Sequence, residues 1–328
     1  MSPRNRTPRR PTARKPTRIT TLAGGVGAAK FIRGLARLVD QARLDIIVNT
    51  GDDEEFYGLH VSPDVDTLLY TLAGLVNRAN GWGLENETFN ALSALERFYG
   101  KAWFGLGDTD LATHLFRTQK MREGTPLSAV TAELAKRLGV RANVMPMTDD
   151  VVATFVTVKG RPPLPFQEYF VRNRFRGEVE SIDLRGAASA RPLPSALESI
   201  SKSVAVILAP SNPFVSLGPI LSLKGVKNAL IAARDRVAAI SPIVGGKTVK
   251  GPADKMLRGL GHEVSPLGVA KIYRDFVGVF VLDRIDARFV DAIRGLGMKA
   301  IATDTIMSSP KRAQKLANVV LDALEVYP

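Results

Sequence analysis

The chain contains no cysteine among its 328 residues. Disulfide bonds, thiolate metal ligands and thiol nucleophiles are therefore excluded. Long apolar runs are missing as well, since no uninterrupted stretch approaches the roughly 20 residues that a helix needs to cross a bilayer. With 45% hydrophobic and 23% charged residues, the composition is that of an ordinary globular protein. We expect a cytoplasmic protein without a membrane partner.

Acidic residues are missing from the first 18 positions, which carry seven basic residues. Since the net charge of the whole chain is +13, an excess of only six positive charges remains for the rest. The same stretch holds four prolines and few apolar side chains, which predicts a disordered basic arm over residues 1–17. A solvated tail is the favoured interpretation of the arm, over a site for nucleic acid or an anionic surface.

Apolar strands and amphipathic helices alternate after the arm. Residues 18–24 are typical of a short strand, 28–39 of a helix, and 43–50 of a strand buried on both faces. This βαβ unit predicts a parallel sheet. Further strands are expected at 203–210, 236–242, 277–283 and 298–303, with helices between them and at the C-terminus. The fold class is therefore α/β, with a Rossmann-like doubly wound, mostly parallel sheet.

The middle of the chain departs from this alternation. Helices are expected over about 64–76 and, with two glycine-rich breaks, over 85–138, whereas 151–158 and 178–183 are strand-like. We therefore expect one domain over residues 18–328. Its Rossmann-like core consists of 18–77 and 201–328, and 78–200 form an inserted, mixed, mostly helical lobe.

Three glycines, Gly24, Gly25 and Gly27, lie between the first strand and the first helix. Free backbone N–H groups and the helix dipole converge at such a turn, which favours phosphate binding over the alternative of a tight turn without ligand. The spacing G-G-x-G is not the G-x-G-x-x-G of nicotinamide sites, and the second strand ends in Asn49 rather than in an acid. No G-K-[ST] follows, so the turn is not a P-loop either.

Carboxylates follow the second strand, four in a row and then two at the start of a helix: Asp52, Asp53, Glu54, Glu55, Asp64 and Asp66. Acids at the carboxyl end of a parallel strand can hold Mg²⁺ against a phosphate, which favours chemistry on a diphosphate. We predict Asp52, Asp53 and Asp66 as metal ligands or general base. Asp64 fits a helix N-cap, and Glu54 and Glu55 fit a solvated loop face.

Two later loops also follow strands. Ser211, Asn212 and Pro213 end one strand, where their polar groups can contact a base or a phosphate and Phe214 can stack on a ring. An asparagine before proline is also an ordinary turn device. In the next loop, "GGKTVK", Lys247 and Lys250 are available for phosphate.

The segment "WFGLGDTDLATHLFRTQ" has glycines before Asp108 and Asp110, then a helix with His114 and Arg117. Asp108 fits a cap of that helix, and a lone histidine is more often packed or solvated than catalytic. Arg117 and Lys120 are candidates to reach an anionic ligand. Asp304, after the last strand, fits a cap as well.

Five segments together resemble the 2-phospho-L-lactate transferase family of deazaflavin coenzyme F-420 biosynthesis, in order and spacing, from Arg18 to the C-terminus. They are "GGVGAAKFIRGL", "VNTGDDEEFYGLHVSPDVDTLLYTLAG", "WFGLGDTDLATHLFRTQ", "LAPSNPFVSLGPIL" and "SPIVGGKTVKGPADK". The resemblance implies transfer of a phospholactyl group from lactyl-2-diphospho-5′-guanosine to the ribityl hydroxyl of the deazaflavin precursor Fo, with release of GMP and a requirement for Mg²⁺. Some bacterial relatives use a phosphoenolpyruvyl-guanosine donor.

By this resemblance, Gly24, Gly25 and Gly27 cradle phosphate, and Asp52 and Asp66 hold the metal with Asp53 close by. Ser211, Asn212 and Pro213 border the guanosine, and Lys247 is available to the diphosphate. The deazaflavin ring needs an aromatic wall, for which the candidates are Trp82, Phe89 and Trp103, with a place in the core as their alternative. The partners are then small molecules, and the family and the helical lobe are compatible with a homodimer.

Two other classes are weighed against this one. A related group with the same fold binds nucleotide-sugars and acts in regulation without known catalysis; it shares the "GG-x-G" turn but not "SPDVDTLLYTLAG" or "GLGDTDLATH". A nicotinamide oxidoreductase is the third class, and the glycine spacing argues against it.

Overall fold

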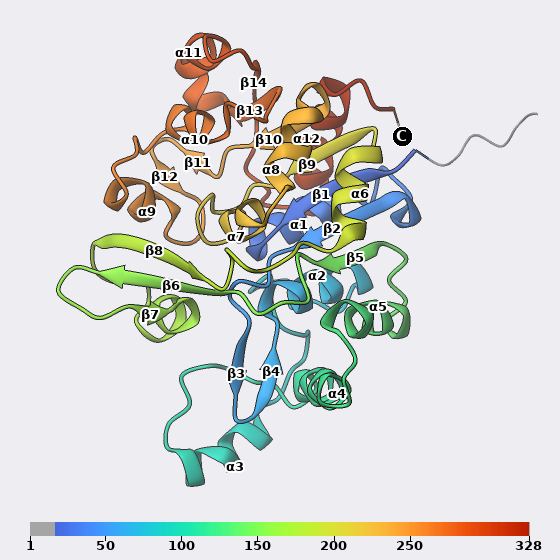
Figure 1. The fold of residues 1–328 in the computed structure, drawn as a ribbon, viewed down its shortest axis with the longest axis vertical. Coiled ribbons are helices and arrows are strands. Elements are labelled where there is room, and N and C mark those ends of the chain that lie inside the picture. Colours follow the sequence, from blue (N-terminus) through green and yellow to red (C-terminus); the bar gives the residue numbers. More distant parts are fainter. Residues whose placement is uncertain (1–16, 328) are drawn as a thin grey trace, which may run out of the picture.

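The computed structural model describes residues 17–327, so the predicted basic arm lies outside the described residues except for Thr17. Its centre is a seven-stranded sheet in the order β14-β13-β10-β9-β1-β2-β5, and every neighbouring pair is parallel (Figure 1). The strands are β1 (Ile19–Ala23), β2 (Leu44–Val48), β5 (Asn143–Pro146), β9 (Ala205–Leu208), β10 (Val237–Ile240), β13 (Val279–Asp283) and β14 (Lys299–Thr303). The predicted doubly wound α/β sheet is confirmed.

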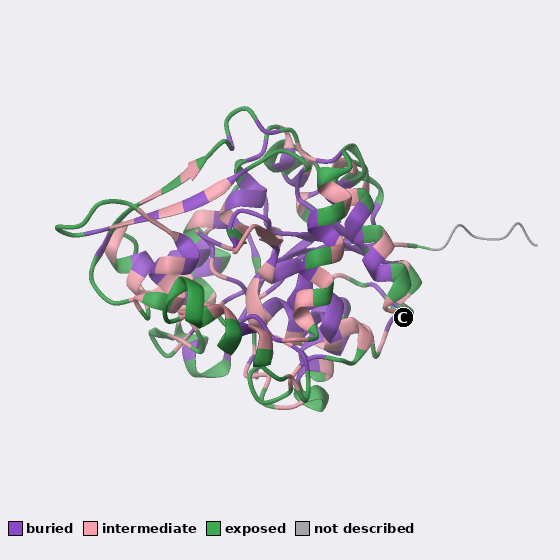
Figure 2. Cartoon of the chain, turned by 90° about the horizontal axis from the view of Figure 1, so that it is seen from below, coloured by how far each residue is buried: buried purple, intermediate pink, exposed green. Residues whose placement is uncertain are grey.

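The central strands consist of apolar and β-branched residues, apart from Asp45 in β2, because helices cover both of their faces. All residues of β1, β2, β9 and β10 are buried. Apolar side chains form one large core on each face. In Figure 2, buried residues fill the middle of the molecule and exposed residues lie on the outer helices.

One face of the sheet is covered by α1 (Gly25–Leu35), α2 (Pro63–Ala73), α5 (Leu127–Arg137) and α12 (Pro310–Ala323). The other is covered by α6 (Pro194–Lys202), α7 (Gly218–Ser222), α8 (Val226–Ala232), α9 (Ala253–Gly259), α10 (Pro266–Tyr273) and α11 (Val290–Arg294). The first helix begins at Gly25, earlier than the sequence analysis placed it. No helix within residues 17–327 is long and apolar enough to cross a bilayer.

The segment 78–200 is divided differently from our prediction. The helices α3 (Asn90–Tyr99), α4 (Asp110–Arg122) and α5 follow the expected pattern, but β5 is an edge strand of the main sheet and pairs with β2. The remainder forms a three-stranded antiparallel sheet, β7-β6-β8, and a short π-helical segment, Glu168–Arg172, lies in the connection from β7 to β8. Its strands are β6 (Ala153–Val158), β7 (Leu164–Pro165) and β8 (Val179–Arg185).

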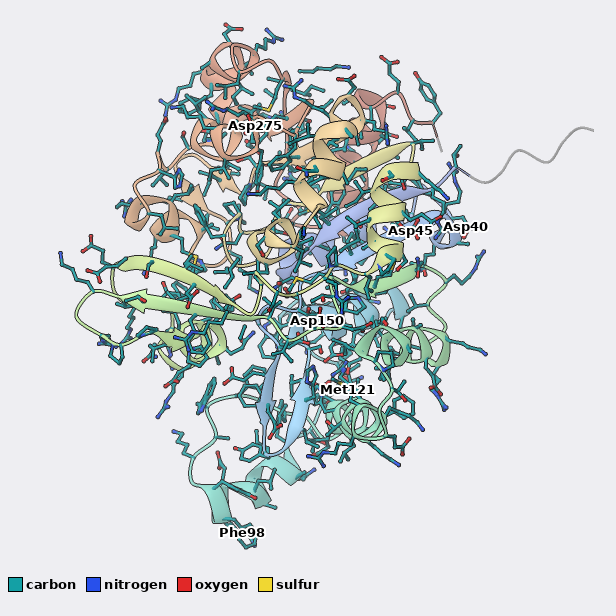
Figure 3. All side chains as sticks on the ribbon, in the orientation of Figure 1. Asp40, Asp45, Phe98, Met121, Asp150 and Asp275 are labelled. Atoms are coloured by element: carbon teal, nitrogen blue, oxygen red, sulfur yellow. The ribbon has the colours of Figure 1, made fainter. Side chains whose placement is uncertain are left out.

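Two hairpins were not predicted. One joins β3 (Glu54–Phe56) to β4 (Leu59–Val61) and extends with α3 away from the sheet, at the bottom of Figure 1. Phe98, labelled in Figure 3, lies at the outer end of this lobe and is 83% exposed. The other hairpin joins β11 (Ile243–Val244) to β12 (Lys247–Thr248).

Candidate functional site

The chain reverses its direction across the sheet between β1 and β9. From β1 the order runs outward through β2 to β5, and from β9 it runs the opposite way through β10 to β14. A crevice outside the carboxyl ends of the strands is expected at such a point. Gly24 follows β1 and Ser211 follows β9 there, and the Ser211 hydroxyl donates to the Gly24 carbonyl at 2.8 Å. The predicted glycine turn and the "SNP" loop are therefore neighbours.

Asn49, at the end of β2, is fully buried and connects the acidic residues of the site. Its Nδ2 lies 2.6 Å from Asp52 Oδ1, 3.0 Å from Asp64 Oδ2 and 3.3 Å from the Val215 carbonyl. Its Oδ1 accepts the Gly51 N–H at 2.9 Å. A neutral amide thus holds two carboxylates within reach of one nitrogen. We had noted Asn49 only as the end of a strand.

Asp64 has a different role from the N-cap expected of it. Ser62 occupies the cap position of α2, and Asp64 is buried in the second helical position. Its Oδ1 accepts the Gly25 N–H at 2.7 Å. A carboxylate of the chain itself therefore occupies an amide that the sequence analysis assigned to phosphate. A phosphate can therefore accept from that amide only if Asp64 moves away from it.

The carboxylates of Asp52 and Asp64 have no basic partner in direct contact among residues 17–327. Burial raises the pKa of Asp52 well above its usual range, and the charges of Asp64 and Asp53 raise it further. Burial also raises the pKa of Asp64 to about 6, although the hydrogen bonds from Asn49 and Gly25 lower it. Asp52 Oδ2 accepts one further hydrogen bond, from Gln167 Nε2 at 3.1 Å. Gln167 is buried and was missed by the sequence analysis.

Asp53 lies beside this pair and faces the β3–β4 hairpin. Its Oδ2 accepts the Ser62 hydroxyl at 2.6 Å and lies 3.0 Å from His60 Nε2. Burial raises the pKa of Asp53, and the hydrogen bond with His60 opposes that shift. Its other oxygen, Oδ1, is buried without a hydrogen-bond partner. Most buried polar atoms have a hydrogen-bond partner, so this oxygen is a candidate contact for a ligand of the site.

Asp66 is not joined to Asp52. Both of its oxygens are bound by the guanidinium of Arg117, with Nη1 at 3.1 Å from Oδ2 and Nη2 on Oδ1. Arg117 is fully buried on α4, and His114 lies beside the pair, with its Nδ1 3.7 Å from Asp66 Oδ2. The paired geometry makes Asp66 a tie between α2 and α4. Its predicted role as a metal ligand stays a prediction.

The other residues of the α4 segment have structural contacts. The Asp108 carboxylate accepts the N–H groups of Asn90 and Ala91, so it caps α3 rather than α4. These bonds and that of the Thr88 hydroxyl, which is the largest cause, lower the pKa of Asp108 to about 2. His114 is buried, with Nε2 3.3 Å from Asp110 Oδ2. The ammonium of Lys120 pairs with Glu123 at 2.7 Å.

The loops after β9, β10 and β14 contain the remaining residues named in the sequence analysis, and these residues differ in their contacts. Asn212 Oδ1 accepts the Phe214 N–H at 2.9 Å, and its Nδ2 lies 3.1 Å from the Met256 sulfur, so Asn212 does serve as a turn device. Phe214 packs against His262, with ring centroids 5.5 Å apart. Lys247 is exposed in the β11–β12 hairpin. Asp304 accepts the Ile306 N–H at 3.3 Å.

A polar cavity of about 310 Å³ lies between the segment after α2 and the start of α4. It is lined by Asn77, Asn80, Trp82, Gly83, Leu84, Glu85, Asn86, Glu87, Phe89, Gly105, Gly107 and Asp110. Trp82 and Phe89 both line it, and each side chain is 47% exposed. Trp103 instead packs on Phe56, with ring centroids 5.3 Å apart. The first two aromatics are therefore placed to hold a planar ligand. A second cavity of about 390 Å³ lies between α5 and β5.

The glycines of the turn are required by close packing. A Cβ at Gly24 would lie 2.8 Å from the Ser216 Cβ, and one at Gly27 would lie 2.4 Å from the Pro210 carbonyl oxygen. Gly25 has φ +72°, which L-residues rarely adopt. The turn is thus closely packed between the loop after β9 and Asp64, so its glycines are needed for packing whether or not the turn binds a ligand.

We predict that Gly27→Ala lowers the free energy of unfolding by about 2 kcal/mol or more, because the backbone around Pro210 has to shift. Chemical denaturation measures this effect. Gly295→Ala is the control, since its nearest contact is a looser 3.3 Å to the Ala292 carbonyl oxygen. Equal stability of the two variants would contradict the packing argument.

A comparison with known protein families identifies the family of this chain. Residues 19–321 match the model of the family "2-phospho-L-lactate transferase CofD". The chain belongs to this family. The resemblance stated from the five segments is confirmed, and the protein is a member of a transferase family, which is consistent with F-420 biosynthesis.

Relatives match over nearly the whole chain. A "Phosphoenolpyruvate transferase" of Streptomyces griseus is 40% identical over 313 residues, which cover 94% of this chain and 98% of the relative. A "2-phospho-L-lactate transferase" of Methanosarcina mazei is 37% identical over 302 residues, with coverage of 92% and 98%. The solved structure of protein BH3568 from Bacillus halodurans superposes on this CofD-family chain with a TM-score of 0.61 and 18% sequence identity. The match covers 94% of this chain and 100% of BH3568. This last likeness concerns the fold.

Proposed function

We propose that the protein transfers a 2-phospholactyl or phosphoenolpyruvyl group from a guanosine-diphosphate-activated donor to the ribityl hydroxyl of 7,8-didemethyl-8-hydroxy-5-deazariboflavin (Fo) and releases GMP. The observation that carries the proposal is a buried acidic cluster at the reversal point of the sheet, beside a cavity with two exposed aromatic rings. The two names found among the relatives support the two candidate groups.

In this reaction the acceptor hydroxyl attacks the phosphorus that carries the three-carbon acid. A new P–O bond forms, the P–O bond to the GMP phosphate breaks, and the hydroxyl proton passes to a carboxylate. GMP leaves as a stable anion, so the protein mainly has to position the two substrates and offset negative charge. Asp53, whose pKa is raised by burial, is suited to accept the proton.

The acidic cluster also fits a divalent cation. Asp52 and Asp64 meet at one amide nitrogen, and Asp53 Oδ1 is buried without a partner. Residues 17–327 contain no group of three or more acidic, histidine or cysteine side chains arranged as a complete metal site. Mg²⁺ typically takes one or two carboxylates and completes its shell with water and substrate phosphates. We therefore propose Asp52 and Asp64 as the Mg²⁺ ligands, and bound Mg²⁺ would neutralise charge on the diphosphate.

The cavity lined by Trp82 and Phe89 is the proposed site of the deazaflavin ring. Residues of its rim lie against the first helix, because a Cβ at Gly81 would meet Val26 at 2.7 Å. Asp110, another lining residue, accepts the Tyr70 hydroxyl of α2 at 2.6 Å. The cavity is thereby tied to both helices that begin at the acidic cluster. A ring held there brings its ribityl chain toward the crevice.

Binding of Fo tests the proposal before any turnover is measured. Fo absorbs and fluoresces in the visible and near ultraviolet, so a fluorescence titration reports its affinity directly. We expect saturable binding of one Fo per chain. Absence of binding, with and without GDP and Mg²⁺, would favour the nucleotide-sugar-binding regulatory class instead.

We predict that Trp82→Ala raises the KM for Fo about tenfold and leaves the KM for the donor unchanged, because the indole supplies half-exposed stacking area in the cavity. Steady-state kinetics with each substrate varied in turn measure this split. Phe98→Ala is the matched control, since Phe98 is 83% exposed and does not line the cavity. A change in both KM values, or in neither, would count against the ring site.

A further inference from the structure

Two lysines converge on the rim of the acceptor cavity from different parts of the fold. Lys250, in the loop after β12, donates from Nζ to the Asn80 carbonyl at 2.8 Å. Lys30, on α1, approaches the next residue, because a Cβ at Gly81 would lie 3.5 Å from its Cε. The segment Asn80–Gly81 is thus held between the two lysines, although 170 positions separate Lys250 from Asn80 in the sequence.

Neither lysine has an acidic partner among residues 17–327. No carboxylate lies within ion-pair distance of Lys30 or Lys250, nor of Arg33 and Arg78 nearby. The Lys250 side chain is exposed to solvent, yet desolvation of its ammonium group, and then the charge of Lys30, lower the pKa of Lys250. Arg33 is affected in the same way by burial and by its basic neighbours, and its Nε is buried without a partner. Uncompensated positive charge of this kind is stabilised by an anion.

The position of the lysines relative to the site narrows the choice of anion. Lys30 lies on the helix that begins at Gly25, between one and two turns after the glycine turn. Asn80, which contacts Lys250, lines the cavity assigned to the deazaflavin ring. The lysines therefore lie at the boundary between the cavity assigned to the deazaflavin ring and α1. The negative charge of the diphosphate, by contrast, is assigned to the carboxyl ends of β1 and β2.

We propose that Lys30 and Lys250 form a second anion subsite, which binds the carboxylate of the three-carbon acid in the donor. This inference rests on the proposed function, because it presumes a donor with a carboxylate beyond its diphosphate. Lactyl and phosphoenolpyruvyl donors both carry that group. The two ammonium groups distinguish the donor, which carries the three-carbon acid, from GDP, which does not. Through the contact between Lys250 and Asn80, the bound donor also touches the rim of the acceptor cavity.

The test compares two ligands that differ in the acid. Affinities for GDP and for lactyl-2-diphospho-5′-guanosine are measured by calorimetry with the wild type, Lys30→Met and Lys250→Met. We expect each substitution to weaken donor binding by about 10- to 100-fold, as for the loss of a charge-assisted hydrogen bond, and to leave GDP binding unchanged. Lys227→Met is the control, because Lys227 is an exposed lysine on α8.

Equal losses for GDP and the donor would overturn the proposal, since the lysines would then serve the diphosphate. Unchanged affinity for both ligands would overturn it as well. Wild-type turnover of Fo, measured in parallel, reports on the proposed function separately. An active wild type with unaffected lysine variants overturns only this inference, whereas a wild type that binds neither ligand and produces nothing overturns both.

Discussion

The Asp52→Asn variant is expected to be at least as stable as the wild type at pH 8 and to lose about 10³-fold in kcat. The amide keeps the volume of the side chain and removes a buried charge that has no basic partner among residues 17–327 and that lies beside Asp53 and Asp64. We expect this gain to offset the hydrogen bond that is lost where the new NH2 group faces the amide of Asn49 or Gln167. Loss of the Asp52 carboxylate removes a ligand for the cation, and charge stabilisation of this kind contributes about 3–4 kcal/mol to a transition state.

The gain in stability follows from the direction of the pKa shift. Burial and the neighbouring acids raise the pKa of Asp52 in the folded protein above its unfolded value. The protonated form is therefore favoured by folding, and its contribution to stability is complete below the unfolded pKa and is lost as pH rises through the folded pKa. Asp64 behaves in the same way, with a window between its usual value of 3.8 and about 6. Replacing Asp52 by asparagine removes the part of this pH-dependent loss of stability that Asp52 causes.

Kinetics and thermal unfolding across pH 5–8 measure both effects. Asp283→Asn is the matched control, because Asp283 is equally buried but lies after β13, outside the acidic cluster, and one of its oxygens accepts both the Thr305 N–H at 2.8 Å and the Thr305 hydroxyl at 2.9 Å. That variant is expected to lose stability and to keep its kcat. An Asp52→Asn enzyme that is active within tenfold of the wild type would remove Asp52 from the mechanism.

The Arg117→Met variant is expected to lose about 3–5 kcal/mol of folding free energy, because it leaves the Asp66 carboxylate buried without its partner. Asp66→Asn leaves the opposite charge uncompensated and is expected to cost a similar amount. The double variant removes both charges and should recover most of the loss. Denaturant unfolding of the four proteins gives the coupling between the two residues.

The same variants decide between two roles for Asp66. If Asp66 only ties α2 to α4, the double variant keeps kcat within about tenfold of the wild type once it is folded. If Asp66 is a metal ligand, as the sequence analysis predicted, the double variant is stable and inactive. The structure favours the first result, because Arg117 binds both oxygens of Asp66.

The main sheet was predictable because its central strands are buried on both faces. Runs such as Ala205–Leu208 are then continuously apolar and can be recognised locally. β5 was missed because it is an edge strand of four residues that begins with an exposed asparagine. The β3–β4 hairpin was missed because its six residues include Glu54, Glu55 and His60, which do not show the alternation of a half-buried strand.

The site was predictable only in part, since local sequence names the acids but not their partners. Asp64 follows a proline at a helix start, which is the pattern of a cap, yet its decisive contact is with Gly25, 39 positions away. Asp66 meets Arg117 at a separation of 51, and Asp52 meets Gln167 at a separation of 115. No signal within one segment shows which charge is neutralised and which is left free.

The most direct test of the central claim is a product assay with the purified protein. It is incubated with Fo, Mg²⁺ and either the lactyl or the phosphoenolpyruvyl guanosine diphosphate donor, and mass spectrometry follows the deazaflavin product and GMP. We predict one phospho-acid added to Fo for each GMP released, with at least one of the donors. Fo that remains unmodified with both donors, in a protein shown to be folded, would contradict the account.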